Sequence, residues 1–156
     1  MTSQTLTNTQ PSFVCQFPAA SADTAINWFS QRLMLETDCS DVHSALQAGA
    51  TDFVLLDVRS SVAFAAGHVP GAIHLPHRQI SEATLSALPP QRLLVVYCAG
   101  PHCNGADQAA LKIARLGYPV KIMIGGLQGY IDEGFSLQTG GPQTGAPQQQ
   151  NAACGC

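Results

Sequence analysis

Short apolar runs separated by polar segments occur in the middle of the chain. FVLLDV at 53–58, LLVVY at 93–97 and VKIMI at 120–124 are runs typical of buried strands. A briefer strand is predicted at 72–75, between two prolines, and a further one can begin at 33–35. No strong hairpin signal joins these runs, so the pattern favours a parallel sheet.

The segments between these runs carry apolar residues at helical spacing. The predicted helices occupy residues 21–32, 40–46, 60–66, 81–88 and 127–133, and another starts near Gly105 and is closed by Gly117. Alternating strands and helices are typical of an α/β fold, in which helices cover both faces of an open parallel sheet.

The two ends of the chain differ in composition from its middle. Residues 1–18 are rich in Ser, Thr, Gln and Asn, and we interpret them as a mobile arm. Residues 138–156 carry no charge and almost no aliphatic side chain, so we expect a flexible tail ending in Cys154-Gly155-Cys156. The folded domain is predicted at 19–137.

Composition excludes several classes of function. The chain has 156 residues, 46% of them hydrophobic, which suits one domain with a sizeable core. Its net charge is −3 and it has seven Lys and Arg, so we expect neither a nucleic-acid nor a membrane partner. The first twenty residues contain no Lys or Arg and no apolar block, so we expect a cytoplasmic protein without a signal peptide.

The strongest predicted strand, at 93–97, leads directly into Cys98. Open parallel sheets bind ligands at the carboxyl ends of their strands. Gly100 and Gly105 allow backbone amides to turn inward, and Asn104 can cap the following helix. A helix N-terminus lowers the pKa of a nearby thiol, so we expect an ionised Cys98 sulfur that is open to solvent. The alternative is that Cys98 is a buried packing residue.

Four motifs carry a family resemblance: LLDVR at 55–59, GHVPGAIHLP at 67–76, VVYCAG at 95–100 and GGLQGYIDEGF at 125–135. Their order and spacing resemble a rhodanese domain, the sulfurtransferase family, over most of residues 33–137. The resemblance implies a rhodanese-like fold and a Cys98 nucleophile. Such a nucleophile attacks the outer sulfur of a donor such as thiosulfate and passes it, as a persulfide, to a thiol or cyanide.

The resemblance also implies which residues bind the substrate. The loop after the nucleophile would hold the persulfide anion through backbone amides, and no organic cofactor is needed. The partners would be a small sulfur donor and a thiol acceptor, which can be a protein thiol. The implied loop residues are Ala99, Gly100, Pro101, His102, Asn104 and Gly105.

The loop departs from the family pattern in one informative way. The family usually has a cation five residues after the nucleophile, but this chain has Cys103 there. Pro101 also lacks an N–H group, so we expect weak thiosulfate turnover unless a protonated His102 supplies charge. The missing cation argues against a phosphatase of this fold. Cys103 either resolves or relays a Cys98 persulfide, or points inward beneath the helix start.

Other polar residues have simpler interpretations. Asp57 and Arg59 are expected to support the site as an ion pair that braces neighbouring loops. Among the histidines at 68, 74 and 77, we expect one to bond a backbone carbonyl and the others to face solvent, with no metal bound. Cys15 and Cys39 are interpreted as small hydrophobes or incidental surface thiols.

Two alternatives to sulfur transfer stay open. One is a thiol redox module, or a zinc or copper site in which Cys98, His102 and Cys103 join Cys154 or Cys156. The other is a catalytically weak rhodanese fold that binds partners. The tail is long enough to return to the domain, and its thiols can then relieve Cys98 or have no role.

Overall fold

The computed structural model describes residues 11–141, which leaves part of the predicted arm and tail, Cys154 and Cys156 included, outside the described residues. By their internal contacts, the described residues divide into two units, 11–32 and 33–141. The first unit contains a 3-10 helix, η1 (Phe13–Cys15), and most of helix α1 (Ala22–Leu35). The second unit contains all the strands described below.

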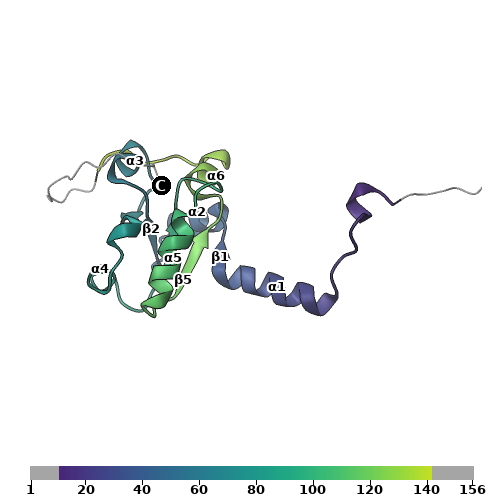
Figure 1. The fold of residues 1–156 in the computed structure, drawn as a ribbon. Helices are drawn as coiled ribbons and strands as arrows, with labels where there is room; N and C mark the ends of the chain where they lie inside the picture. Colours follow the sequence, from purple (N-terminus) through teal and green to yellow (C-terminus); the bar gives the residue numbers. More distant parts are fainter. Residues whose placement is uncertain (1–10, 142–156) are drawn as a thin grey trace, which may run out of the picture. The chain divides into compact units, whose positions relative to one another are not determined.

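A parallel sheet forms the centre of the second unit (Figure 1). Its strands in the described residues are β1 (Glu36–Thr37), β2 (Phe53–Asp57), β3 (Ile73–His74), β4 (Leu93–Tyr97) and β5 (Val120–Met123). They lie in the order β1-β5-β4-β2-β3, and every neighbouring pair is parallel. The predicted α/β fold with an open parallel sheet is confirmed. Both edge strands have only two residues.

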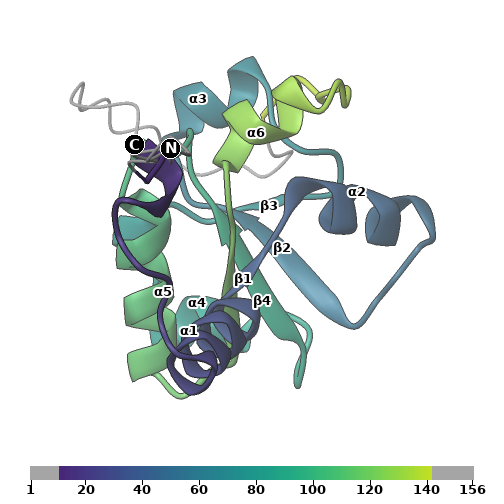
Figure 2. The same cartoon turned by 90° about the vertical axis from the view of Figure 1, so that its right-hand side faces the viewer.

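Helices cover both faces of this sheet. They are α2 (Cys39–Gln47), α3 (Ser61–Ala66), α4 (Glu82–Ser86), α5 (Gly105–Arg115) and α6 (Gly126–Asp132), with the short η2 (His77–Gln79). One core cluster contains residues of α4 and α5, and a second contains residues of α2 and α6. Figure 2 shows α5 and α2 on opposite sides of the strands.

Side chains alternate along the two central strands. On β4, Leu94 and Val96 belong to the α4–α5 cluster, whereas Val95 and Tyr97 belong to the α2–α6 cluster. This is the period of two that a strand buried on both faces requires. Cys98 continues the Leu94–Val96 series and belongs to the α4–α5 cluster. The strand therefore places the Cys98 thiol beneath the start of α5.

Several element boundaries differ from the prediction, and two of the differences have a clear local cause. The strand predicted to begin at 33–35 is instead the last turn of α1, and β1 starts one residue later. The run Arg32–Leu35 favours a helix, and Lys121 Nζ donates to the terminal carbonyl of Leu33 at 2.7 Å. Helix α2 begins before Ser40, because Asp38 caps it by accepting a hydrogen bond from the Asp41 amide at 2.7 Å.

The start of the predicted tail contacts the domain. Gln138 and His68 exchange two backbone hydrogen bonds of 2.9 Å in an antiparallel bridge, and the Gly140 amide donates to Ala65 at 2.9 Å. Residues 138–140 therefore continue the ordered chain past the predicted boundary.

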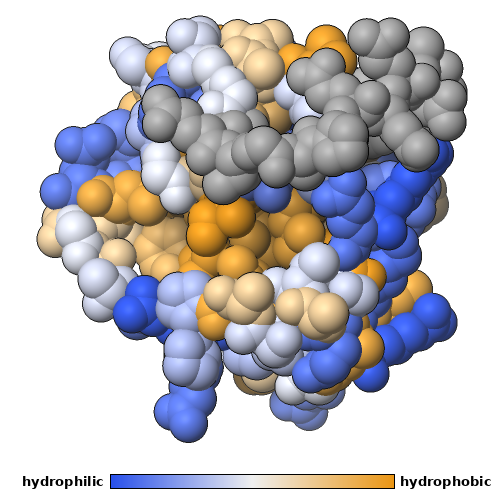
Figure 3. Space-filling view, turned by 90° about the vertical axis from the view of Figure 1, so that its left-hand side faces the viewer, coloured by the Kyte–Doolittle hydropathy of each residue, from blue (hydrophilic) through white to orange (hydrophobic). Residues whose placement is uncertain are grey.

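Figure 3 shows that apolar surface gathers at the centre of one face, on the side that carries α3 and α4 in Figure 1, with hydrophilic residues toward the two lateral margins of that face. Within residues 11–141, no helix combines the length and apolar character needed to cross a bilayer.

Candidate active site

Cys98 lies just past the end of β4 and is buried, with 2% of its surface exposed. It packs in the core cluster with Val58 and Ala106. The prediction of a sulfur open to solvent is therefore wrong, because the alternation along β4 turns this side chain under α5. Cys98 also lines a cavity, which is its route of access.

Cys103 is the immediate neighbour of Cys98. Their Sγ atoms lie 2.6 Å apart, compared with about 2.05 Å for a disulfide bond. Both residues are thiols in this structure, and Cys103 is half-buried. The Gly105 amide donates to Cys103 Sγ at 3.3 Å. The first amide of α5 thus donates to Cys103, which lines the cavity and also packs against the core cluster beneath the helix start.

Gly105 occupies a position with no room for a side chain. A Cβ atom added there would lie 2.8 Å from Cys98 Sγ and 3.3 Å from Cys103 Sγ. The sulfur pair is therefore seated directly on the backbone of the helix start. The side chain of Asn104 does not cap this helix as predicted; its Oδ1 accepts a hydrogen bond from Gln108 Nε2 at 2.8 Å instead.

The loop after Cys98 is fixed from the other side by α6. The amides of Leu127 and Gln128 donate to the carbonyls of Cys98 and Ala99, both at 2.9 Å. Because a trans peptide points its C=O and N–H in opposite directions, the Ala99 and Gly100 amides face away from α6. Helix α6 thus holds the loop by two of its carbonyls, and the Ala99 and Gly100 amides lie on the opposite side of the loop.

A cavity of about 200 Å³ lies against this loop. Four of the predicted site residues line it: Cys98, Gly100, Pro101 and Cys103. The rest of its lining is Glu36, Ala106, Asp107 and residues 122–126. Among the described residues that form its wall there is no Lys, Arg or His.

The remaining predicted loop residues lie elsewhere. Gly105 contacts the sulfur atoms from behind, whereas Ala99, His102 and Asn104 are absent from the lining. His102 is exposed, and its ring lies near Gly100, within 3.3 Å of the place where a Cβ of that glycine would lie. An imidazolium charge at His102 is therefore outside the cavity wall.

The model of the rhodanese-like domain matches residues 38–133, which contain every strand except β1 and the whole loop around Cys98. The chain belongs to the rhodanese-like domain family.

Several relatives of this rhodanese-like domain are known. An HTH-type transcriptional regulator of Mycobacterium tuberculosis, Rv0324, is 35% identical over 94 residues, which are 60% of this chain and 41% of the regulator. This chain thus spans less than half the length of that curated relative. The crystal structure of the BH2092 protein from Bacillus halodurans is 34% identical, with a TM-score of 0.74, and the match covers 76% of this chain and 87% of that one.

A third similar structure bears the family's description. It is the solution structure of the rhodanese-like domain from the Anabaena protein Alr3790, 26% identical with a TM-score of 0.60. The match covers 76% of this chain and 90% of that domain.

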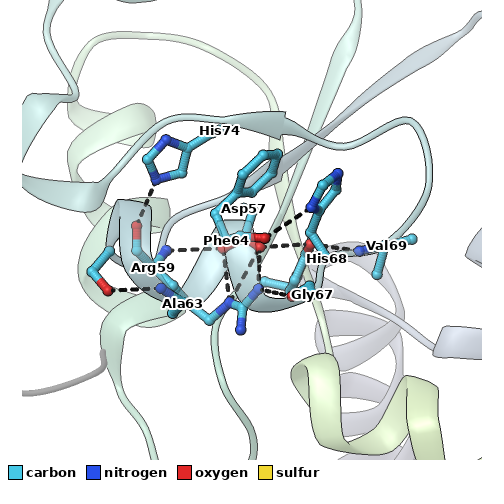
Figure 4. Close-up of polar contacts among 10 residues, drawn as sticks. Asp57, Arg59, Ala63, Phe64, Gly67, His68, Val69 and His74 are labelled. Carbon is cyan, nitrogen blue, oxygen red and sulfur yellow. Dashed lines mark hydrogen bonds and ion pairs between the residues drawn. The ribbon is translucent and has the colours of Figure 1, made fainter. Parts of the chain in front are cut away.

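A buried ion pair braces the rhodanese-like domain beside the site (Figure 4). Arg59 Nη2 donates to Asp57 Oδ2 at 2.6 Å and to the Gly67 carbonyl at 2.7 Å. Tyr97 OH donates to Asp57 Oδ2 at 2.8 Å and accepts from the Val69 amide at 3.0 Å. Asp57 and Tyr97 share the α2–α6 side of the sheet, opposite Cys98, so the pair braces loops and does not line the cavity.

The brace also sets the charge states of its members. Burial lowers the pKa of Arg59, but hydrogen bonds to Asp57 and the charge of that carboxylate outweigh it, so the pKa lies above the usual value. Burial and the Asp57 charge raise the pKa of Tyr97. The Arg59 guanidinium therefore stays charged and the Tyr97 phenol stays protonated, so the hydrogen bonds of both groups to Asp57 persist.

The histidines follow the prediction only in part. His68 Nδ1 bonds the Phe64 carbonyl at 2.9 Å, as expected of one imidazole. His74 does not face solvent, because its Nε2 bonds the Arg59 carbonyl at 3.0 Å (Figure 4). The His77 Nδ1 atom is buried without a hydrogen-bond partner in the described structure. Burial, then the charges of the Lys and Arg at 112 and 78, lower the pKa of His77.

Cys39 is a small hydrophobe of the core, one of the two interpretations offered from the sequence. Its Sγ donates to the Ile124 carbonyl at 3.3 Å and approaches the Gly126 carbonyl at 3.6 Å. Burial, followed by the charge of Asp38, raises the pKa of Cys39 to about 11. This thiol supports the backbone at one end of the cavity and stays protonated.

Sequence reasoning missed the two acidic residues of the cavity, Glu36 and Asp107. Asp107 was visible only as a favourable charge in the first turn of a helix. Glu36 reaches the site because β1 pairs with β5, in the register that sets Glu36 opposite Ile122. No local sequence pattern reports such a pairing between distant segments.

Proposed function

We propose that this rhodanese-like domain is a sulfurtransferase that carries sulfane sulfur as a persulfide on Cys98. The observation that carries the proposal is the pair of thiols, 2.6 Å apart, at the carboxyl end of β4 and on the wall of a cavity. Membership of the family adds support, since the Cys98 loop lies within the matched residues.

Loading Cys98 exchanges one sulfur–sulfur bond for another. The Cys98 thiolate attacks the outer sulfur of a donor such as thiosulfate, and a new bond forms between the two sulfur atoms. The donor's own S–S bond breaks, and its electron pair leaves with sulfite. The product is a Cys98 persulfide, and no external oxidant or reductant is consumed.

Unloading can follow two courses, which differ in the role of Cys103. In one, an acceptor thiolate, either external or Cys103 itself, attacks the outer sulfur and takes it as a persulfide. In the other, the Cys103 thiolate attacks Cys98 Sγ, a disulfide forms and hydrosulfide leaves. The second course oxidises two thiols as it reduces the sulfane sulfur, so a thiol reductant must restore the enzyme.

The test is mass spectrometry of the chain after exposure to a sulfane-sulfur donor. We expect the mass of one added sulfur atom on the Cys98 peptide, and none at that peptide in Cys98→Ser. The matched control is Cys15→Ser, which removes an exposed thiol outside the site and leaves loading unchanged. Sulfur on Cys39, Cys103 or the tail, with none on Cys98 in the time course, would overturn the assignment.

The role of Cys103 is resolved by the same measurement in Cys103→Ser. If Cys103 discharges Cys98, the Cys98 persulfide accumulates in this variant and released hydrosulfide falls. If an external thiol is the only acceptor, the lifetime of the persulfide in the absence of that thiol is the same in both proteins.

The thiol distance also favours a second candidate function, a dithiol redox module. At 2.6 Å, a small movement brings the two sulfur atoms to bonding distance. A disulfide that forms and is reduced reversibly, in a protein that no sulfane-sulfur donor loads, is the result that would favour this function.

A further inference from the structure

The cavity beside Cys98 has an acidic wall. Glu36 reaches it from β1 and Asp107 reaches it from the first turn of α5, whereas no Lys, Arg or His stands among its described lining residues. At low ionic strength, a carboxylate on the wall of a cavity acts on a charged substrate that comes within a few ångströms of it, even where the carboxylate is exposed to water. The Asp107 carboxylate on this wall therefore repels an anionic donor and attracts a cationic group.

Part of the loop backbone is unavailable to an anion. Position 101 is a proline and has no N–H, the Cys103 amide donates to the Gly100 carbonyl at 3.0 Å, and the Gly105 amide donates to Cys103 Sγ at 3.3 Å. These three positions of the loop are thus unavailable to the oxygen atoms of a dianion such as thiosulfate. Cys103, which stands in place of the family's cation, accepts the hydrogen bond of the first amide of α5.

We propose, resting on the function proposed above, that the donor is a small sulfane-sulfur compound bearing an ammonium group, and that Asp107 determines this specificity. Asp107 is exposed at the rim of α5, so its carboxylate can pair with an ammonium group while the donor's sulfur reaches Cys98. A cavity of about 200 Å³ suits a donor of a few heavy atoms.

The transfer step also conserves atoms and electrons when the donor carries an ammonium group. For an aminoalkyl thiosulfonate, the Cys98 thiolate attacks the terminal sulfur and forms the persulfide. The bond between that sulfur and the sulfonyl sulfur breaks, and its electron pair leaves with the aminoalkyl sulfinate. The ammonium group takes no part in the bond changes and serves only to orient and attract the donor.

Three donors with related leaving groups but different charge test the proposal. They are thiosulfate, a dianion; ethanethiosulfonate, a monoanion; and 2-aminoethanethiosulfonate, a zwitterion. The rate of Cys98 loading by each, at low ionic strength, is divided by the rate of the same donor with 2-mercaptoethanol, which removes differences in intrinsic reactivity. We expect the zwitterion to be fastest and thiosulfate slowest, with steps on the order of tenfold per charge.

Asp107→Asn then isolates the proposed residue. This near-isosteric change should reduce the preference for the zwitterion over the monoanion severalfold, because it slows loading by the zwitterion and accelerates loading by the monoanion. Asp52→Asn is the matched control, because Asp52 is an exposed carboxylate outside the cavity lining, and the preference should not change. Added salt should narrow the preference in the wild type.

The outcomes separate this inference from the proposed function. If thiosulfate loads Cys98 fastest, or Asp107→Asn leaves the preference unchanged, the inference is overturned while sulfur transfer by Cys98 stands. If none of the three donors loads Cys98, the proposed function fails, and the donor specificity fails with it.

Discussion

Replacing Asp57 by Asn should remove a large part of the stability of the domain. The carboxylate is fully buried and accepts hydrogen bonds from the Arg59 amide at 3.0 Å, from Nε at 3.0 Å and from Nη2 at 2.6 Å. It also accepts the Tyr97 hydroxyl at 2.8 Å. Asparagine has one acceptor oxygen and no charge, so the variant leaves a buried guanidinium, 5% exposed, without a counter-ion.

The magnitude follows from that unpaired cation. Breaking a buried ion pair by removing one partner costs about 3–5 kcal/mol, whereas replacing both partners by apolar groups is often close to neutral. A domain of this size has a free energy of unfolding of roughly 5–15 kcal/mol, so the single change removes about a fifth of it or more. The double variant Asp57→Asn/Arg59→Met should therefore recover part of what Asp57→Asn loses.

Urea unfolding of the wild type, both single variants and the double variant gives the four free energies of a double-mutant cycle. We expect Asp57→Asn to lower the free energy of unfolding by at least about 3 kcal/mol, with a coupling energy above about 1 kcal/mol. Asp52→Asn, at an exposed position, is the control. A loss below about 1 kcal/mol for Asp57→Asn, or additive single changes, would refute the assignment of this ion pair as a structural brace.

Three further predictions concern other parts of the domain. The lowered pKa of His77 means that the folded state resists protonation there, so its contribution to stability is complete above the ordinary pKa of 6.5 and is lost as the pH falls through the lower folded value. His77→Gln should flatten this acid slope in urea unfolding between pH 7 and 5, and an unchanged slope would contradict the interpretation. Cys39, with its pKa near 11, should react with iodoacetamide at pH 8 about a hundredfold more slowly than exposed Cys15, and equally fast in urea. Gly126→Ala should cost about 2 kcal/mol or more in unfolding free energy, because φ is +59° and a Cβ would lie 2.6 Å from a backbone carbonyl of the active-site loop. Gly134→Ala, at φ +82° with nothing within 4 Å, measures the backbone term alone, and equal losses would exclude a steric contribution at Gly126.

The sheet and most helices were predictable because their signals are local. Unbroken apolar runs mark strands buried on both faces, and Ser60 and Ser81 cap α3 and α4 from within their own segments. The same unbroken runs conceal which face each residue occupies. The sequence therefore left the burial of Cys98 as one of two alternatives, since it depends on the alternation of β4 against two different helix layers.

The site was predictable to the extent that it lies in one loop. The spacing of Cys98 and Cys103 across a short turn indicated that the thiols can meet, and the structure brings them to 2.6 Å. The acidic character of the cavity was not predictable, because Glu36 comes from an edge strand paired with β5. Asn104 shows the converse case, in which a favourable capping residue bonds the side chain of Gln108.

The two-residue strands at the margins of the sheet limit how this domain can associate. A longer exposed margin would offer rows of peptide groups on which foreign chains could extend the sheet, with fibrous association as the hazard. Here each edge strand has only two residues and therefore exposes few unpaired backbone N–H and C=O groups. A partner protein would therefore meet mainly the loops and side chains of this domain, because its sheet offers almost no open edge on which a strand could be added.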